Sequence, residues 1–73
     1  MNEKEMMKLD MVKSLALLLM DSDSQITIEE ALSTVLNSDT YQRLQKDSTG
    51  FYYQSPRYVY AFLQNELKTG SIK

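Results

Sequence analysis

Acidic and amide side chains between residues 21 and 25 have the spacing of a calcium-binding loop. Asp21, Asp23 and Gln25 fall at the first, third and fifth positions of a helix–loop–helix calcium site. The sixth position requires glycine for a sharp turn and is Ile26, and the twelfth requires a bidentate glutamate and is Leu32. Because both the turn and the strongest ligand are missing, we expect a solvated acidic loop and no metal site.

Other side chains that perform catalysis are scarce. The chain contains no cysteine and no histidine, so the commonest nucleophile–base pairs, thiolate metal sites and disulfides are excluded. Gly50 and Gly70 are the only glycines, so there is no glycine-rich phosphate loop. The ten acidic residues allow paired carboxylates, but 73 residues leave little room for a dry pocket. The sequence therefore predicts a protein that is not an enzyme and carries no cofactor.

The charge balance and the hydropathy pattern narrow the classes of partner. The formal net charge of −2 opposes non-specific attraction to phosphate backbones. The longest apolar run, Leu15–Met20, has six residues, far short of the roughly 20 that cross a bilayer. Acidic residues precede this run and the polar segment Asp21–Ser24 follows it, so no targeting segment is expected. We expect a cytoplasmic protein that does not bind membranes.

Helix start and stop signals divide the chain into elements. Thr27 with Glu30 forms a capping box, and Ser55 before Pro56 is a strong start signal for a last helix, which Gly70 would terminate. The helices are expected at Asn2 or Glu3 to Met20, after Thr27 to Asn37-Ser38, at Thr40 to about Lys46, and at Pro56 to about Thr69. We expect a turn at Asp47–Gly50 and an extended aromatic segment at Phe51–Gln54.

These elements predict an all-α fold in which residues 1–73 form a single helical domain. It would be a small bundle of three main helices plus one short helix, with the short extended aromatic segment before the last helix. The predicted core comprises apolar residues at helical spacing, namely Met11, Val12, Leu15, Ala16, Leu18, Leu19, Ile28, Ala31, Leu32, Val35, Leu36, Tyr41, Leu44, Val59, Phe62, Leu63 and Leu67.

The first helix carries apolar residues on a second face as well. Leu17 and Met20 lie away from the predicted core face, and Met6 and Leu9 are roughly in line with them. A contiguous exposed apolar strip is typical of an interface, and small domains often recruit a partner. We therefore expect a homodimer that joins through this strip. In the alternative arrangement, the other helices wrap the first helix from both sides within a monomer.

Aromatic residues are concentrated in the second half of the chain. Six of them occupy the twelve positions from Phe51 to Phe62. Tyrosines either pack in a core with the hydroxyl reaching a partner, or supply contact area in an interface. We expect most of this cluster to be core, with Tyr60 and one of Tyr52 and Tyr53 exposed as candidate interface residues.

A helix–turn–helix arrangement is the alternative interpretation. The second and third helices would then be the scaffold and the reader, and the segment Phe51–Gln54 a small wing. The candidate DNA contacts on the third helix are Gln42, Arg43, Gln45 and Lys46, with Tyr41 beside them. Basic residues are few, and acidic residues are close to them in sequence, so nucleic-acid binding is less favoured than protein binding.

Short motifs in residues 38–70 carry a resemblance to known proteins. They are Ser38-Asp39-Thr40-Tyr41, Leu44, Thr49-Gly50-Phe51-Tyr52, Gln54-Ser55-Pro56, Tyr58-Val59-Tyr60 and Glu66-Leu67 with Gly70. In these motifs the chain resembles a family of small uncharacterised bacterial helical proteins, and weaker similarity extends upstream through Ile26–Leu36. The resemblance implies a compact helical domain from a bacterial cytoplasm, without an activity or a catalytic residue. The composition and the exposed apolar strip favour a non-catalytic protein-interaction or regulatory module that self-associates as a homodimer, and any other protein partner is unknown.

Overall fold

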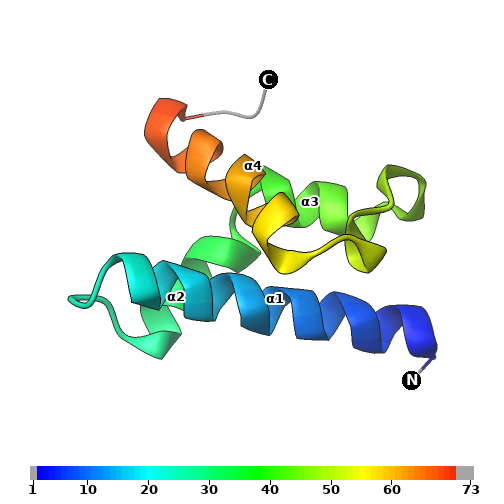
Figure 1. Cartoon of the computed structure of the whole chain (residues 1–73), viewed down its shortest axis with the longest axis horizontal. Helices are drawn as coiled ribbons and strands as arrows, with labels where there is room; N and C mark the ends of the chain where they lie inside the picture. Colours follow the sequence, from blue (N-terminus) through cyan, green and yellow to red (C-terminus); the bar gives the residue numbers. More distant parts are fainter. Residues whose placement is uncertain (1, 71–73) are drawn as a thin grey trace.

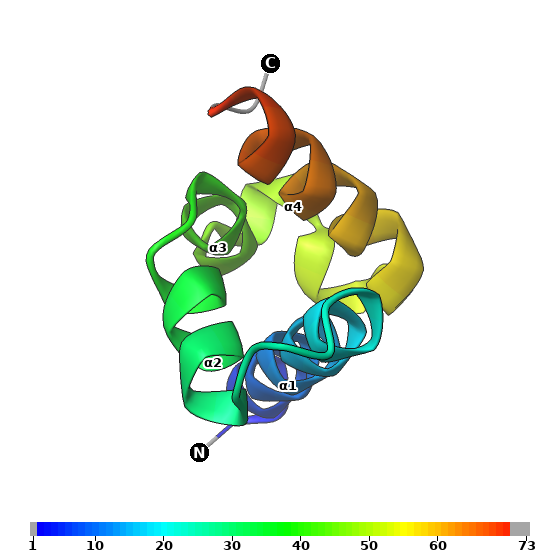
Figure 2. The ribbon, with the colours of Figure 1, turned by 90° about the vertical axis from the view of Figure 1, so that its left-hand side faces the viewer.

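The computed structural model describes residues 2–70, which form helices and turns and contain no strand. The elements are α1 (Glu3–Ser22), α2 (Ile28–Leu36), α3 (Asp39–Gln45), α4 (Pro56–Thr69) and two single 3-10 turns, η1 (Asp47–Thr49) and η2 (Phe51–Tyr53). In Figure 1, α1 runs along one side of the molecule with α3 and α4 above it, and α2 overlaps the second half of α1 in this view. Viewed nearly along α1, the four helices form a ring around the core (Figure 2). The predicted all-α bundle is confirmed.

Side-chain caps fix where the helices begin. The Asn2 side chain accepts a hydrogen bond from the backbone N–H of Glu5 at 2.8 Å. At the start of α2 both halves of the predicted capping box are present, with the Glu30 N–H donating to Thr27 Oγ1 at 3.2 Å and the Thr27 N–H donating to Glu30 Oε1 at 2.9 Å. Ser55 caps α4 and Pro56 occupies its first turn, as predicted.

The two glycines both stand where the backbone is left-handed. Gly70 ends α4 with a φ of 86°, as expected for a helix terminator. Gly50 joins η1 to η2 with a φ of 69°. A Cβ atom on Gly50 would lie 2.6 Å from the hydroxyl oxygen of Tyr53, at the end of an exposed side chain that can move aside. The turn therefore favours glycine because of its left-handed conformation.

The segment that was expected to be extended is instead a 3-10 turn. After the left-handed Gly50, the Tyr53 N–H donates to the Gly50 carbonyl at 3.3 Å and the Gln54 N–H donates to the Phe51 carbonyl at 3.2 Å. This turn points Phe51 into the molecule, where its ring packs on Phe62 with centroids 5.0 Å apart. The prediction of an extended segment was wrong because the pattern of aromatics does not distinguish a strand from a tight turn.

One apolar core lies inside the ring of helices. Leu15, Leu44 and Leu63 are fully buried, together with Val35 and Val59. Leu18, Leu32, Tyr41 and Phe62 are only partly buried and pack against this core. Three predicted core residues, by contrast, are exposed, namely Ile28, Leu36 and Leu67. Ile28 and Leu36 are the first and last residues of α2, and Leu67 is in the last turn of α4, so all three overhang a core that is shorter than the helices.

Candidate functional site

The outer face of α1 carries three exposed large apolar side chains along one helix. We define it by Met6, Leu9, Asp10, Lys13 and Leu17, all of which are exposed. Met6 is 55%, Leu9 50% and Leu17 60% accessible to solvent. α2 and α4 flank α1, and none of the described helices covers the side that faces out of the ring (Figure 2). The face is therefore apolar at both ends and charged in the middle.

A groove runs beside the first half of this face, between α1 and α2. Met6 and Leu9 line it from α1, and Leu32 and Leu36 line it from α2, with Asp10 and Lys13 at its edge. Leu36 overhangs the core and is 45% exposed, so it adds apolar surface to the groove.

A second groove runs beside the other half, between α1 and the start of α4. Leu17 and Leu18 form its apolar wall together with Pro56, and Asp21 and Arg57 bring one charge of each sign to it. The two grooves therefore lie on opposite sides of the outer face of α1. Each has an exposed apolar side chain of that face, Met6 or Leu17, in its wall.

Met20 was expected to share the outer face but does not. Its side chain is half-buried and packs against the core. α1 is longer than predicted and ends at Ser22, so Met20 lies inside the last turn of the helix. Met6, Leu9 and Leu17 are the members of the predicted strip that remain exposed.

The chain was compared with family models, with curated proteins and with solved structures. None of these comparisons finds a match. The observations that bear on function are therefore the faces, grooves and charges of residues 2–70.

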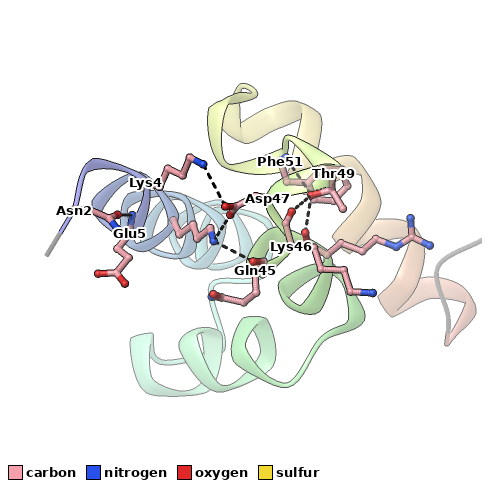
Figure 3. A network of polar contacts seen from close by, with 10 residues as sticks. Asn2, Lys4, Glu5, Gln45, Lys46, Asp47, Thr49 and Phe51 are labelled. Carbon is pink, nitrogen blue, oxygen red and sulfur yellow. Dashed lines mark hydrogen bonds and ion pairs between the residues drawn. The ribbon is translucent and has the colours of Figure 1, made fainter.

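Two lysines of α1 meet a carboxylate that follows α3 (Figure 3). Lys8 Nζ donates to Asp47 Oδ1 at 2.8 Å and to the backbone carbonyl of Gln45 at 3.0 Å, and Lys4 Nζ donates to Asp47 Oδ2 at 3.3 Å. Both ammonium groups also lie over the ring of Tyr52, at 5.8 and 6.0 Å from its centroid. This cluster ties the first half of α1 to the end of α3.

The same contacts shift two ionisation equilibria. The hydrogen bond from Lys8, followed by that from Lys4, holds the pKa of Asp47 below its usual value. The hydrogen bond to Asp47 is the main cause that raises the pKa of Lys4, and the charges of Asp47 and Tyr52 add to it. Half of the surface of each Lys4 and Asp47 side chain faces solvent, so the cluster is a structural tie screened by water and not a reactive centre.

The three candidate interface tyrosines have different environments. Tyr53 is 62% exposed, whereas Tyr52 is partly buried and stacks edge-on against Tyr53 with centroids 5.2 Å apart. Tyr60 was expected to be exposed and is buried. Its hydroxyl lies 2.8 Å from Ser22 Oγ and donates to the carbonyl of Leu18 at 3.4 Å, so the end of α1 satisfies its polar group.

The candidate DNA contacts lie on or next to a very short helix. Gln42, Arg43 and Gln45 are exposed on α3, which has seven residues, and Lys46 is exposed at its C-cap. Only Asn37 and Ser38 separate α3 from α2. η2 takes the place of the expected wing, so no strand follows α3 in the described part of the chain.

In the acidic loop between α1 and α2, an aspartate side chain accepts a backbone hydrogen bond. Asp23 Oδ1 accepts a hydrogen bond from the Gln25 N–H at 3.0 Å, and Ile26 packs half-buried against the core in place of a turn glycine. Residues 2–70 contain no group of three or more acidic side chains placed to hold a metal ion. Within the same residues, no helix has the length and apolar character required to cross a bilayer.

Glu66 forms polar contacts with α3 that the sequence pattern did not reveal. Its carboxylate on α4 accepts hydrogen bonds from the N–H groups of Asp39 and Thr40, at 2.7 and 2.9 Å, and from Thr40 Oγ1 at 2.9 Å. A carboxylate at a helix N-terminus is stabilised by unpaired amides and by the helix dipole. Because Glu66 is 26 or 27 residues from its partners, no local motif marks it.

Proposed function

We propose that this protein is a non-catalytic protein-interaction module that self-associates through the outer face of α1. The observation that carries the proposal is the alignment of Met6, Leu9 and Leu17, each at least half exposed, along one face of the longest helix. Apolar grooves flank this alignment on both sides. Contiguous apolar surface of this kind is typical of protein interfaces.

The energetics support a partner on this face. Full burial of a leucine or methionine side chain is worth about 1.5–3 kcal/mol, and a half-exposed side chain retains roughly half of that gain for a partner. A core within a domain of about 70 residues supplies only about 3–5 kcal/mol of net stability, so burial of three more side chains is a substantial addition. Docking of a second copy would bury the same side chains twice.

Sedimentation equilibrium of the wild-type chain tests the proposal. We expect a dimer at high micromolar concentration, and Leu17→Glu should shift the population to monomer while the helical circular dichroism signal is retained. Leu67→Glu is the matched control, because Leu67 is 49% exposed on α4, away from the outer face of α1. A wild-type chain that sediments as a monomer, or a dimer that Leu67→Glu splits and Leu17→Glu does not, contradicts it.

A small DNA-binding regulator is the second proposal, supported by the exposure of Gln42, Arg43, Gln45 and Lys46 on and next to α3. The net charge of −2 and the short α3 weigh against it. Electrophoretic mobility shifts with pooled genomic fragments should show no selective complex at physiological salt. A selective shift that Arg43→Ala abolishes would reverse the order of the two proposals.

Membership of the family of small bacterial helical proteins is a further proposal, and with it a cytoplasmic location. The residues that support it include the caps and terminators Ser38, Gly50, Ser55 and Gly70, which argue for a shared fold rather than a shared activity. The absence of cysteine from the sequence is compatible with a reducing compartment. Fractionation of the native cells with an antibody against the chain tests the location.

A further inference from the structure

The outer face of α1 has a symmetric order of side chains. Met6, Asp10, Lys13 and Leu17 follow one another at separations of four, three and four positions, as apolar, acidic, basic and apolar residues. At about 3.6 residues per turn, these positions form one ridge along the helix. All four side chains are exposed, and neither Asp10 nor Lys13 forms an ion pair with another residue in the range 2–70.

Two copies of this ridge are complementary in charge only when their α1 helices run in opposite directions. Consider a two-fold axis that crosses α1 between residues 11 and 12. It places each residue of one copy opposite a residue of the other copy, and the two residue numbers add up to 23. Met6 then faces Leu17 of the second copy, and Asp10 faces its Lys13, with both contacts repeated by symmetry. A parallel pair would instead place Asp10 against Asp10 and Lys13 against Lys13, which is repulsive.

We infer that the partner of this face is a second copy of the chain, docked with the two α1 helices antiparallel so that Asp10 of each copy pairs with Lys13 of the other. The inference rests on the proposed self-association and specifies its geometry. It gives each flanking groove an occupant. The groove between α1 and α2, beside Met6, receives Leu17 of the second copy, and the groove between α1 and α4, beside Leu17, receives its Met6.

α1 is long enough for this arrangement. Its 20 residues span about 30 Å at 1.5 Å per residue. The molecule is 34 Å along its longest axis, and α1 runs along most of that length (Figure 1). Two apolar contacts at the ends and two charge pairs in the middle therefore lie on one continuous surface.

Cysteine cross-linking tests the antiparallel direction, and the natural chain has no cysteine to interfere. Under mild oxidation, an equimolar mixture of Met6→Cys and Leu17→Cys chains should form the mixed disulfide. Met6→Cys alone should not cross-link, because its two copies lie roughly 16 Å apart along the axis, beyond the ~7 Å between Cα atoms that a disulfide spans. Efficient cross-linking of Met6→Cys to itself, or none in the mixture, overturns the inference.

Charge reversal tests the pairing without changing the apolar contacts. Asp10→Lys alone and Lys13→Asp alone should each raise the dimer dissociation constant about tenfold at low ionic strength, and less at 1 M salt, where the Debye length is about 3 Å. An equimolar mixture of these two variants should associate as well as the wild-type chain. The double variant Asp10→Lys/Lys13→Asp should also associate with itself but not with the wild-type chain. If the dimer were parallel, the double variant would instead pair preferentially with the wild-type chain.

The two proposals fail in different ways. A wild-type chain that remains monomeric at high micromolar concentration overturns both the self-association and its geometry. A wild-type dimer that all three charge variants leave unchanged overturns the antiparallel pairing and leaves the self-association in place. A dimer of the wild-type chain that forms mixed dimers with the double variant also overturns the antiparallel pairing.

Discussion

The inner and outer faces of α1 both carry leucine, but the leucines have opposite environments. Leu15 is fully buried on the inner face, whereas Leu17, two residues later, is 60% exposed on the outer face. Both are leucines in the middle of one long helix, so the difference arises from what packs on each side and not from local propensity. The inner face therefore contributes to folding, whereas the outer face is where we propose that a second copy binds.

Truncation of the two leucines should give the largest contrast. Leu15→Ala removes side-chain atoms that fill the core, so we expect a loss of about 2–5 kcal/mol in the free energy of unfolding. Leu17→Ala at a monomeric concentration should change it by less than about 0.5 kcal/mol. Urea denaturation followed by circular dichroism measures both, with Leu15→Met as a variant that conserves volume. Equal losses at the two positions would remove the distinction between the faces.

Polar contacts follow the same division between inside and outside. Glu66 is partly buried and holds the start of α3 through three hydrogen bonds, whereas Asp47 lies at the surface beyond the end of α3 and meets two lysines of α1. A charged acceptor of backbone amides in a partly dry site is worth more than an exposed ion pair. The two ends of α3 should therefore differ in their sensitivity to substitution.

Removal of the Glu66 carboxylate tests its partly buried hydrogen bonds to α3. Glu66→Ala leaves two backbone amides and the Thr40 hydroxyl without their acceptor, and we expect a loss of about 1–3 kcal/mol in the free energy of unfolding. Glu66→Gln keeps one acceptor oxygen without the charge and should lose less. Gln64→Ala, an exposed neighbour on α4, is the matched control. If Glu66→Ala has the stability of this control, the tie between α4 and α3 is not maintained in solution.

Removal of the cap on α4 should have a smaller effect. Ser55 Oγ accepts a hydrogen bond from the Tyr58 N–H at 3.2 Å, and Pro56 prevents the helix from starting at another residue. We expect Ser55→Ala to destabilise the fold by about 1 kcal/mol, the usual cost of a lost N-cap. Ser24→Ala in the exposed connector serves as the control in the same denaturation experiment. An unchanged midpoint for Ser55→Ala would show that solvent replaces the cap at no cost.

Local signals made much of this fold predictable from the sequence. The Thr27 and Ser55 caps involve residues within three positions of each other, so their motifs specify the helix starts directly. Features that depend on distant residues were missed. Tyr60 is buried because Ser22 and Leu18, about 40 positions away, satisfy its hydroxyl.

The outer face of α1 was partly predictable because helical periodicity is also a local signal. Helical periodicity placed Met6, Leu9 and Leu17 away from the core, and all three are exposed. It also placed Met20 there, but the packing at the end of the helix buries that side chain in part. Periodicity gives the side of the helix on which a residue lies, whereas burial depends on which other elements reach that side.

The smallest expected effect on stability concerns the exposed contacts of Asp47 with Lys4 and Lys8 and their dependence on pH. The pKa of Asp47 is lowered in the folded protein, so the native state favours the ionised carboxylate. Its contribution to stability is therefore present above its usual pKa of 3.8 and is lost as the pH falls through the lowered value. Lys4 has the opposite sign, because its pKa is raised, so its contribution is complete below 10.5 and is lost as the pH rises through the raised value.

Urea midpoints for the wild-type chain and Asp47→Asn should thus differ slightly at pH 7, and the two midpoints should converge as the solution is acidified below pH 3.8. The difference at pH 7 should also shrink at 1 M salt, because both Lys4 and Asp47 are exposed and their attraction is screened. Asp21→Asn, which removes an exposed carboxylate without an ion pair in residues 2–70, should show neither behaviour. If the midpoints of the wild-type chain and Asp47→Asn still differ in acid, Asp47 acts through its shape and hydrogen bonds in η1 and not through its charge. The contrast between the partly buried Glu66 contacts and the exposed Asp47 contacts of α3 would then be one of packing alone.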